Sequence, residues 1–574
     1  EADHELNEGI DFLDCSQQHW LKQSSTLMHY RPLGVVVITA PWNFPFAISL
    51  GMITAALLTG NSIIFKPSPD AIWVGWELVC LLWEAGVSKQ HLQFIICDSS
   101  AVGTQLIRHP LVKGISLTGS TKTAQLFSSL NSDCRLIAET GGKNTLTLSA
   151  LTDHDLAISV LLKSCYSYSG QKCSAASIIF IEESLYNDTV FIETLCEAIE
   201  SLPMGPSTSA HSYITPLIRE PEDPLLFCLT SLEEGQSWLV KPQKHPDNPH
   251  LWSPGLIKGL APHHRLFKEE CFGPIAGLMP YSSFDEVIDH IQSIPYALTA
   301  GLVSLSSQEH TIWTQNVRVG NRYINQATVG AKVGLQPFGG MKLSSFNKSF
   351  KAGGPYYLFN FMTLSTPFPI PSAPKSMIND SLAFLLLLAK RTLSSHQVLL
   401  FTRAVHHYLN SATRKKWIRQ HTVIEGEYNG YQLAAIPKAV IRIESTEKQL
   451  DPWLSIAAAL ACGAPVELSL NPSLSLSKLP FPCTSIHRES FDQFMSRQIA
   501  HPPEMIRMVS GSAIKPDWST LQSTGCFIQT LPPHKCGDHE LLNYLEEMTT
   551  SSCCHRYGIK HPPHIASLSA KRFV

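Results

Sequence analysis

The sequence predicts an α/β fold in which parallel sheets are covered by helices on both faces. Three observations carry this prediction. Between residues 34 and 200, short apolar runs alternate with amphipathic stretches of helical length, and strands that alternate with helices favour a parallel sheet. Between residues 364 and 376, prolines cluster among small residues, which indicates a linker. Beyond the linker, part of the first pattern recurs weakly.

The elements of the first part are predicted in chain order from their apolar runs and breakers. The run Gly34-Val35-Val36-Val37-Ile38 predicts a buried strand, because it is apolar throughout. Alternating elements follow it, with helices expected at residues 46–58 and 71–84 and strands at residues 61–65, 93–96, 114–117 and 135–138. The second helix is expected to stop at Gly86.

The part after the linker echoes the first part in two places. Residues 457–463 resemble residues 54–60 at an offset of 463 − 60 = 403, and residues 437–441 resemble residues 32–36 at 437 − 32 = 405. Two echoes in one order predict a second, degenerate strand–helix–strand unit, although Ala-rich helices also match by chance. In this unit Ser469 would take the place of Lys66, and Lys448 that of Asn43.

The composition of the 574-residue chain indicates a globular protein with more than one domain. Hydrophobic residues make up 44% of the chain and charged residues 16%, which argues against disorder. The 44 basic and 47 acidic residues nearly balance, so no nucleic-acid partner is expected. The longest apolar run, residues 382–389, is shorter than the roughly 20 residues that cross a bilayer, so no integral membrane segment is expected.

The 15 cysteines follow no secretory signal, because the chain opens with an acidic and polar segment. We therefore expect mostly reduced thiols and a cytoplasmic location. Cys553, Cys554 and His555 are adjacent, but no second pair of ligands stands at zinc spacing. No metal site is expected.

Two motifs place a thiol and an amide where chemistry could occur. Cys173 lies in Gly170-Gln171-Lys172-Cys173-Ser174-Ala175, where small neighbours let a substrate approach. Alone this signal is weak, because most cysteines are structural. Asn43 follows the strand at residue 34, at the sheet edge where ligands of parallel sheets bind. Its amide can donate to a developing oxyanion there.

Three further motifs end predicted strands. Lys66, in Phe65-Lys66-Pro67-Ser68-Pro69, could reach a ribose hydroxyl or be a solvated loop residue. Ser120, in Thr118-Gly119-Ser120-Thr121, opens a helix whose free amides suit a pyrophosphate, and a plain N-cap is compatible with that role. Glu139 precedes the pair Gly141-Gly142, which an ordinary turn would also explain.

In this order, the motifs resemble those of the aldehyde dehydrogenase superfamily. The separations 173 − 139 = 34 and 66 − 43 = 23 fit that family. Two later motifs fit as well, Glu269-Glu270-Cys271-Phe272-Gly273-Pro274 and Gln336-Pro337-Phe338-Gly339-Gly340. The resemblance covers roughly residues 1–361, and the number of ordered motifs makes a chance match negligible.

A narrower resemblance is to the L-glutamate γ-semialdehyde (1-pyrroline-5-carboxylate) dehydrogenase modules of the proline utilization A family. It is carried by residues 170–175, 319–325, 351–355 and 554–558. Longer members of that family carry a non-catalytic aldehyde-dehydrogenase-like domain after the active one. The resemblance thus implies a Rossmann-like NAD-binding domain (1–144), an α/β catalytic domain (145–363), a Pro-rich linker (364–380) and a degenerate Rossmann-like domain (381–574).

The resemblance also implies roles for individual residues. Cys173 would attack the aldehyde, Asn43 would hold the oxyanion, and Glu139 would activate water to release the acid. The cofactor would be NAD, and its expected contacts are Lys66, Ser68, Gly119, Ser120, Glu270 and Phe272. Pro69 stands where many relatives have Glu, so one ribose contact is in doubt, with Asp70 a possible substitute.

The substrate would be bound through its own charges and its aliphatic chain. Residues 325–334 form a loop in which the backbone amides of Gly330 and Ala331 could cradle an anion. The family uses this loop with the serine after the nucleophile, here Ser174. Phe44 and Phe338 would wall the chain of the substrate, although both could instead be plain core.

The expected partners are a small-molecule substrate, a proline dehydrogenase module in cis or in trans, and further copies in a homo-oligomer. FAD is expected only in that module, which is absent from this chain. Two alternatives remain open, since the chain begins inside a helix of the cofactor domain. It could be a weakened fragment that serves as a scaffold for partner modules, or a dehydrogenase for another semialdehyde that bears a carboxylate.

Overall fold

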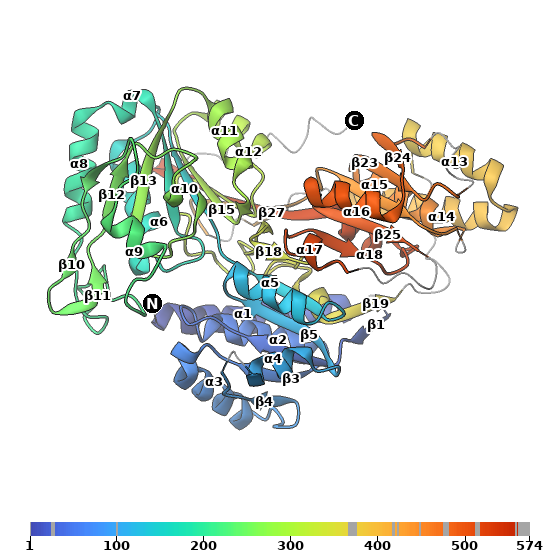
Figure 1. Cartoon of the computed structure of the whole chain (residues 1–574), viewed down its shortest axis with the longest axis horizontal. Coiled ribbons are helices and arrows are strands. Elements are labelled where there is room, and N and C mark those ends of the chain that lie inside the picture. Colours follow the sequence, from blue (N-terminus) through green and yellow to red (C-terminus); the bar gives the residue numbers. More distant parts are fainter. Residues whose placement is uncertain are drawn as a thin grey trace.

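Three main sheets organise the chain in the computed structural model (Figure 1). The described residues are 2–24, 29–98, 101–365, 376–415, 419–421, 424–446, 449–474, 481–510, 517–556 and 559–560. Among them, no helix is long and apolar enough to cross a membrane. Tyr557 and Gly558, and most of the predicted Pro-rich linker, lie outside the described residues.

The first sheet has six strands in the order β18-β6-β5-β2-β3-β4 and is parallel except for β18. Its strands are β2 (Val35–Thr39), β3 (Ser62–Lys66), β4 (Leu92–Phe94), β5 (Val112–Thr118), β6 (Arg135–Glu139) and β18 (Ser345–Phe346). Its helices are α1 (Ala2–Ser24), α2 (Ala47–Leu58), α3 (Ile72–Glu84), α4 (Ala101–Arg108) and α5 (Thr121–Leu130). The predicted alternation of strands and helices is thus confirmed, with bounds that shift by only a few residues.

The second sheet has ten strands in the order β20-β21-β27-β16-β15-β7-β8-β13-β12-β9. Its strands are β7 (Asn144–Leu148), β8 (Ala176–Glu182), β9 (Ser237–Val240), β12 (Gly255–Lys258), β13 (Ile275–Tyr281), β15 (Thr299–Val303), β16 (Asn321–Ile324), β20 (Arg419–His421), β21 (Glu427–Ala435) and β27 (Leu545–Cys553). The helices along its part of the chain are α6 (His154–Tyr166), α7 (Glu183–Tyr186), α8 (Thr189–Glu200), α9 (Leu225–Thr230), α10 (Arg265–Lys268), α11 (Phe284–Ser293) and α12 (Ser307–Asn316).

The third sheet has five parallel strands in the order β24-β23-β22-β25-β26. Its strands are β22 (Ala439–Ile443), β23 (Val466–Leu470), β24 (Ser485–Arg488), β25 (Met505–Val509) and β26 (Phe527–Gln529). Its helices are α13 (Asp380–Thr392), α14 (Ser395–Lys415), α15 (Asp451–Cys462), α16 (Phe491–Ala500), α17 (Ser519–Gln522) and α18 (Gly537–Glu540). This order matches β4-β3-β2-β5-β6 of the first sheet, so the predicted degenerate repeat is present.

The structure corrects the register of this repeat. The first residues of β22, α15 and β23 follow those of β2, α2 and β3 at 439 − 35 = 404, 451 − 47 = 404 and 466 − 62 = 404. The counterpart of Lys66 is therefore Leu470 rather than Ser469. The two sequence resemblances gave offsets of 403 and 405, one residue below and one above the structural offset of 404. The position proposed for the counterpart of Asn43, Lys448, lies outside the described residues.

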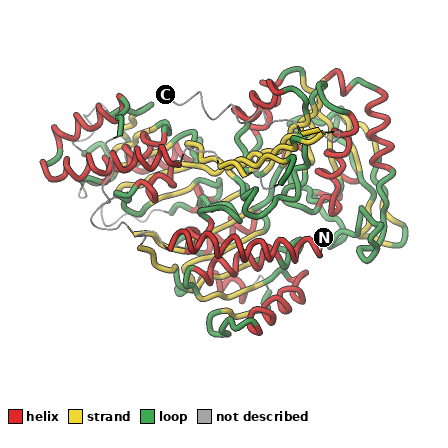
Figure 2. The backbone as a smooth tube through the Cα atoms, turned by 180° about the vertical axis from the view of Figure 1, so that it is seen from behind, coloured by secondary structure: helices red, strands yellow, loops and turns green. Residues whose placement is uncertain are grey.

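Three strands from the last part of the chain, β20, β21 and β27, complete the second sheet. β27 pairs with β16 in parallel, and β21 pairs with β27 in an antiparallel register over nine residue pairs. Figures 1 and 2 show long strands that cross between the third sheet and the second. The range 381–574 thus supplies both the five-stranded sheet and the edge of the ten-stranded one, and its boundaries as a domain stay a prediction.

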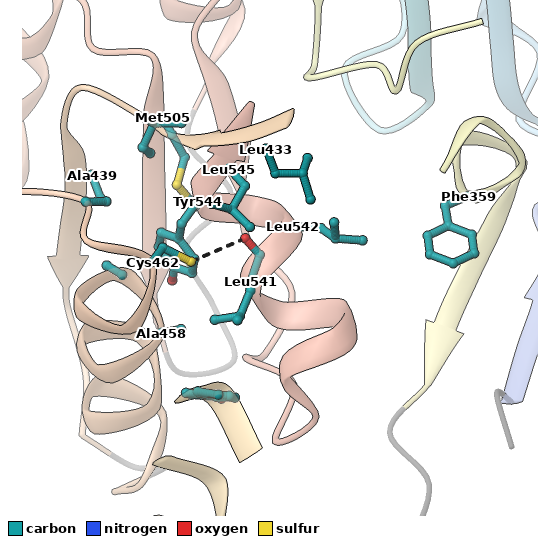
Figure 3. Packing of buried hydrophobic residues seen from close by; sticks show 14 of the residues in the cluster. Phe359, Leu433, Ala439, Ala458, Cys462, Met505, Leu541, Leu542, Tyr544 and Leu545 are labelled. Atoms are coloured by element: carbon teal, nitrogen blue, oxygen red, sulfur yellow. Dashed lines mark hydrogen bonds between the residues drawn. The ribbon is translucent and has the colours of Figure 1, made fainter. Parts of the chain in front are cut away.

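One continuous cluster of buried apolar residues joins the first and third sheets. It includes Leu50 of α2, Trp453 of α15 and Leu541 of the 3₁₀ helix η5 (Leu541–Tyr544). Figure 3 shows Leu541 beside α15, where the Cys462 thiol donates to the Leu541 carbonyl at 3.7 Å. Each fully buried leucine stabilises this packing by about 1.5–3 kcal/mol.

Short elements complete the fold. Four two-stranded ribbons pair β1 (His29–Pro32) with β19 (Met362–Ser365), β10 (Lys244–His245) with β11 (Asn248–Trp252), β14 (Tyr296–Ala297) with β17 (Met341–Lys342), and β28 (His555–Arg556) with β29 (Ile559–Lys560). The other 3₁₀ helices among the described residues are η1 (Pro69–Ala71), η2 (Ser167–Gly170) and η3 (Tyr357–Phe361).

Candidate active site

Two cavities meet at Cys173 and Glu139, which line both of them. The larger cavity, of about 610 Å³, lies along the carboxyl ends of β2, β3 and β5 and is also lined by Asn43. The smaller cavity, of about 120 Å³, lies toward the loop at residues 330–338. The nucleophile and the carboxylate predicted from the sequence therefore stand at the junction of a large site and a small one.

Cys173 is held by a turn with an unusual backbone. Tyr168, Ser169 and Gly170 all have positive φ, at 57°, 54° and 70°. A Cβ at Gly170 would lie 2.3 Å from the Gly273 carbonyl oxygen, so the turn requires glycine there. Burial raises the pKa of the Cys173 thiol to about 12, and the carboxylates of Glu270 and Glu139 act in the same direction. In this state the nucleophile is a thiol that must lose its proton before it attacks.

Asn43 is buried directly beside the nucleophile loop. Its Nδ2 donates to the Gln171 carbonyl oxygen at 3.0 Å. An amide nitrogen carries two hydrogens, so a second one remains for an oxyanion in the cavity that Asn43 lines. The Gln171 carbonyl, two residues before Cys173, thus fixes the orientation of the Asn43 amide, the predicted oxyanion donor.

Glu139 ends β6 inside the protein. Its Oε2 accepts from the Gly340 amide at 3.2 Å, while its buried Oε1 has no hydrogen-bond partner. Burial raises the pKa of this carboxyl to about 8, and the nearby charge of Lys351 opposes that rise. A carboxyl with a raised pKa and an open oxygen in a cavity is suited to take a proton from water.

Lys351, Glu547 and Tyr431 form a buried network behind Glu139 that the sequence did not single out. The Lys351 ammonium donates to the carbonyls of Gly320 and Gly339, at 2.7 Å each. The Lys351 amide donates to Glu547 Oε2 at 2.7 Å, and the Tyr431 hydroxyl donates to Glu547 Oε1 at 2.7 Å. Glu547 and Tyr431 belong to β27 and β21, so only the tertiary pairing of those strands brings them here.

All six residues predicted to contact the cofactor line the larger cavity: Lys66, Ser68, Gly119, Ser120, Glu270 and Phe272. Ser120 is the N-cap of α5 and accepts from the Thr123 amide at 3.1 Å, and both residues line the cavity, so this helix begins at the cavity wall. Phe272 has a φ of 56°, and its ring packs edge-on against Trp42.

Glu270 reaches across to the glycine pair after β6. Its Oε1 accepts from the Gly142 amide at 2.9 Å, and a Cβ at Gly141 would lie 2.0 Å from Oε2. Glycine is therefore required for this close approach. Polar side chains at the strand ends, a helix N-terminus and a cavity of this size together fit a dinucleotide.

Asp70, the possible substitute for the missing ribose contact, lines the larger cavity together with Arg219. Both of its carboxylate oxygens accept from Arg219, with Nη2 to Oδ2 at 2.6 Å and Nε to Oδ1 at 3.2 Å. A ribose contact from Asp70 would therefore share this carboxylate with Arg219, and that role stays a prediction.

The five residues predicted to contact the substrate all line the smaller cavity: Phe44, Ser174, Gly330, Ala331 and Phe338. Gly330 has a φ of 82°, which a side chain would strain. Lys172 also lines this cavity, and its ammonium lies 5.3 Å from the centre of the Phe44 ring. The sequence placed Lys172 inside a motif without giving it a role, because its direction depends on the turn at Gly170.

Away from this site, His407, Cys536 and Asp538 lie together within the part of the chain that the structure describes. His407 Nδ1 already accepts from the Gly537 amide at 3.0 Å, and Asp538 pairs with Arg414 at 3.0 Å. His407 Nε2 lies 3.9 Å from Cys536 Sγ, so the three side chains also contact one another.

Comparisons with known proteins agree with this geometry. Residues 4–366 match the protein family described as the aldehyde dehydrogenase family. The chain is 32% identical over 382 residues to 1-pyrroline-5-carboxylate dehydrogenase of Oceanobacillus iheyensis, covering 63% of this chain and 73% of that one. It is 31% identical over 386 residues to the Bacillus subtilis protein of that name, covering 64% and 74%.

Solved structures extend the similarity. Proline utilization A from Corynebacterium freiburgense matches 97% of this chain with a TM-score of 0.85 and 29% identity. The chain spans 54% of the length of that protein. A 1-pyrroline-5-carboxylate dehydrogenase from Thermus with bound NAD matches 63% of this chain and 74% of its own, with a TM-score of 0.59 and 29% identity.

Proposed function

Because this chain belongs to the aldehyde dehydrogenase family, we propose that it oxidises L-glutamate γ-semialdehyde, the open form of 1-pyrroline-5-carboxylate, to L-glutamate with NAD. The observation that carries the proposal is the position of Cys173 and Glu139, which line both the dinucleotide-sized cavity and the smaller one. An aldehyde in the smaller cavity would meet the thiol on one side and the cofactor on the other.

The chain's own residues perform the acyl chemistry. The Cys173 sulfur adds to the aldehyde carbon after its proton has left, and the Asn43 amide donates to the oxygen that becomes negative. NAD, when bound, accepts the hydride from that carbon. Glu139 then takes a proton from water, which attacks the remaining thioester and frees both the acid and the thiol.

Proton transfer in this sequence depends on the environment of three groups. With a pKa of about 12, the Cys173 thiol needs a base. Glu270, with a pKa of about 7, and Glu139, with a pKa of about 8, both act on this thiol, so its deprotonation does not depend on Glu139 alone. Release of the acid is assigned to Glu139, whose Oε1 has no hydrogen-bond partner and can take the proton from water.

Recognition of the substrate would use the charges at its far end. Gly330 and Ala331 line the smaller cavity, where their amides would suit the α-carboxylate, and Lys172 lines the same cavity with a positive charge. Phe44 and Phe338 would pack on the aliphatic chain. Ser174 would donate to the carboxylate from the residue after the nucleophile.

The remaining parts of the proposal concern the whole protein. We infer that residues 381–574 contain a non-catalytic copy of the cofactor fold, since Leu470 stands in the place of Lys66. A proline dehydrogenase module that binds FAD would supply the substrate, in cis or in trans. A homo-oligomer and a cytoplasmic location complete the proposal.

The test is NADH formation by the purified chain with three aldehydes. We expect 1-pyrroline-5-carboxylate to give at least about tenfold higher kcat/KM than succinate semialdehyde, which lacks the ammonium group and is one carbon shorter, and butanal to give less still, because it also lacks the carboxylate. Faster oxidation of succinate semialdehyde would instead support a dehydrogenase for another acid semialdehyde. No NADH from any of them would support the scaffold alternative.

A further inference from the structure

Two buried cysteines lie in contact behind the wall of the larger cavity. Cys271 Sγ is 3.4 Å from Cys228 Sγ. Cys228 lies in α9, while Cys271 stands between Glu270 and Phe272, which both line the cavity. The mechanism proposed above uses neither thiol.

A lysine without a hydrogen-bond partner is buried beside this pair. Lys143 is 3% exposed, and its Nζ has no hydrogen-bond partner. Burial lowers the pKa of Lys143, and the nearby Cys271, Cys228, Glu270 and Glu269 act in the opposite direction. A thiolate on Cys271 would therefore favour the ammonium form of Lys143, and the ammonium would favour the thiolate.

The two thiols differ in their readiness to ionise. The hydrogen bond with Cys228 and the charge of Lys143 lower the pKa of Cys271, against its burial and the carboxylates of Glu269 and Glu270. The same hydrogen bond and burial raise the pKa of Cys228, although Lys143 and Arg265 act in the opposite direction. Cys271 is thus the nucleophilic member of the pair, and Cys228 the one placed to react second.

We propose that Cys271 and Cys228 are a redox pair that a hydroperoxide closes to a disulfide, and that this bond displaces the cofactor-binding segment at residues 269–273. The Cys271 thiolate attacks the O–O bond, so that sulfur gains one hydroxyl and the other oxygen leaves as water or an alcohol. The Cys228 sulfur then attacks the sulfenic acid, its proton joins the departing hydroxyl, and a second water leaves. A dithiol reductant reverses the change by the same exchange chemistry.

The geometry explains why such a bond would matter. Disulfide sulfurs lie about 2.05 Å apart, so the pair must close by more than 1 Å. The segment has little slack, because a Cβ at Gly273 would lie 2.5 Å from Leu225 of α9 and Phe272 already has positive φ. Closure would therefore move Glu270 and Phe272, and a shift of about 1 Å in a positioned group costs up to about 100-fold.

The experiment uses the full chain with Cys173→Ala, so that the nucleophile itself cannot be oxidised. The protein is treated with hydrogen peroxide, digested without reductant, and mapped by mass spectrometry, while NAD binding is followed by fluorescence. We expect a linked Cys228–Cys271 peptide and at least about tenfold weaker NAD binding, both reversed by dithiothreitol. When Cys228→Ala is added to this background, NAD binding should stay unchanged under peroxide. Cys134 is also a buried thiol, so Cys134→Ala is the matched control, and this variant should still lose NAD binding.

The role of Lys143 has its own readout. Lys143→Met should slow disulfide formation about threefold for each unit by which the pKa of Cys271 rises above the assay pH, since the smaller thiolate fraction is partly offset by greater nucleophilicity. The rate of peptide linkage measures this. Absence of the linked peptide, or equal loss of NAD binding with Cys228→Ala, would overturn the proposal. The effect on NAD binding rests on the proposed cofactor site. If the reduced protein binds no NAD, that site fails, while the peptide map still decides whether the pair closes.

Discussion

Replacing Glu139 by Gln should separate the two halves of the reaction. The amide fills the same space and can keep the contact with the Gly340 amide, but it cannot take a proton from water. Release of the acid should therefore slow more than formation of the thioester. A pre-steady-state burst of NADH followed by slow turnover is the expected signature.

The raised pKa of Glu139 sets the size of this effect at each pH. With a pKa of about 8, only about one-tenth of the carboxyl is ionised at pH 7, and most of it is ionised at pH 9. A positioned general base contributes about 10²–10⁴-fold. The ratio of wild-type to Glu139→Gln release rates should therefore be about 10–10³ at pH 7 and about tenfold larger at pH 9.

Stopped-flow absorbance of NADH at several pH values measures both phases. Glu286→Gln on the surface of α11 makes the same chemical change outside the cavities and should leave both phases as in the wild type. If Glu139→Gln slows both phases equally, the residue orients the thiol instead. A rate ratio that does not change with pH would contradict the raised pKa.

Three other changes test neighbouring parts of the account. Asn43→Ala should lower kcat/KM about 10²–10³-fold with unchanged NAD binding, and an effect below tenfold would remove it from the oxyanion site. Glu547→Ala removes the hydrogen bonds that Glu547 accepts from the Tyr431 hydroxyl and the Lys351 amide, so thermal denaturation should show a loss of about 2–4 kcal/mol. Deleting residues 381–574 removes β27 from the edge of β16, and light scattering should show aggregation. A truncated chain that stays soluble and keeps full activity would contradict a role for residues 381–574 in stabilising the second sheet.

The sequence was sufficient to find the residues that line the site, because their motifs follow strands of one parallel sheet. Asn43, Lys66 and Glu139 each stand at or just after a strand whose apolar run is plain. Topology brings such strand ends to one edge, so local patterns were enough. Their chemical roles stay predictions until they are tested.

The network behind Glu139 could not be predicted in this way. Glu547 and Tyr431 carry no motif, and they reach Lys351 only because β27 and β21 extend the second sheet. The contact between Cys228 and Cys271 likewise depends on how α9 packs against Gly273. Pairing between distant segments is a property of the folded core, which periodicity along the chain does not encode.

For the repeat, the sequence predicted the correct strand–helix–strand unit but placed the counterpart of Lys66 one residue too early. Similar runs of residues gave offsets of 403 and 405, whereas the structural offset is 404. A register error of one residue in a strand matters, because it places each side chain on the opposite face of the sheet. Backbone pairing settles the register, because Ile443 pairs with Leu470 as Thr39 pairs with Lys66. The inference that the lysine is missing survives this correction.

The central claim is that Cys173 carries the acyl group, and one measurement tests it directly. The Glu139→Gln variant, mixed with NAD and 1-pyrroline-5-carboxylate and quenched in acid, should accumulate the thioester. Mass spectrometry should then find a glutamyl acyl group on the peptide that contains Cys173, and on no other cysteine peptide. An unmodified Cys173 peptide alongside a full burst of NADH would contradict the account.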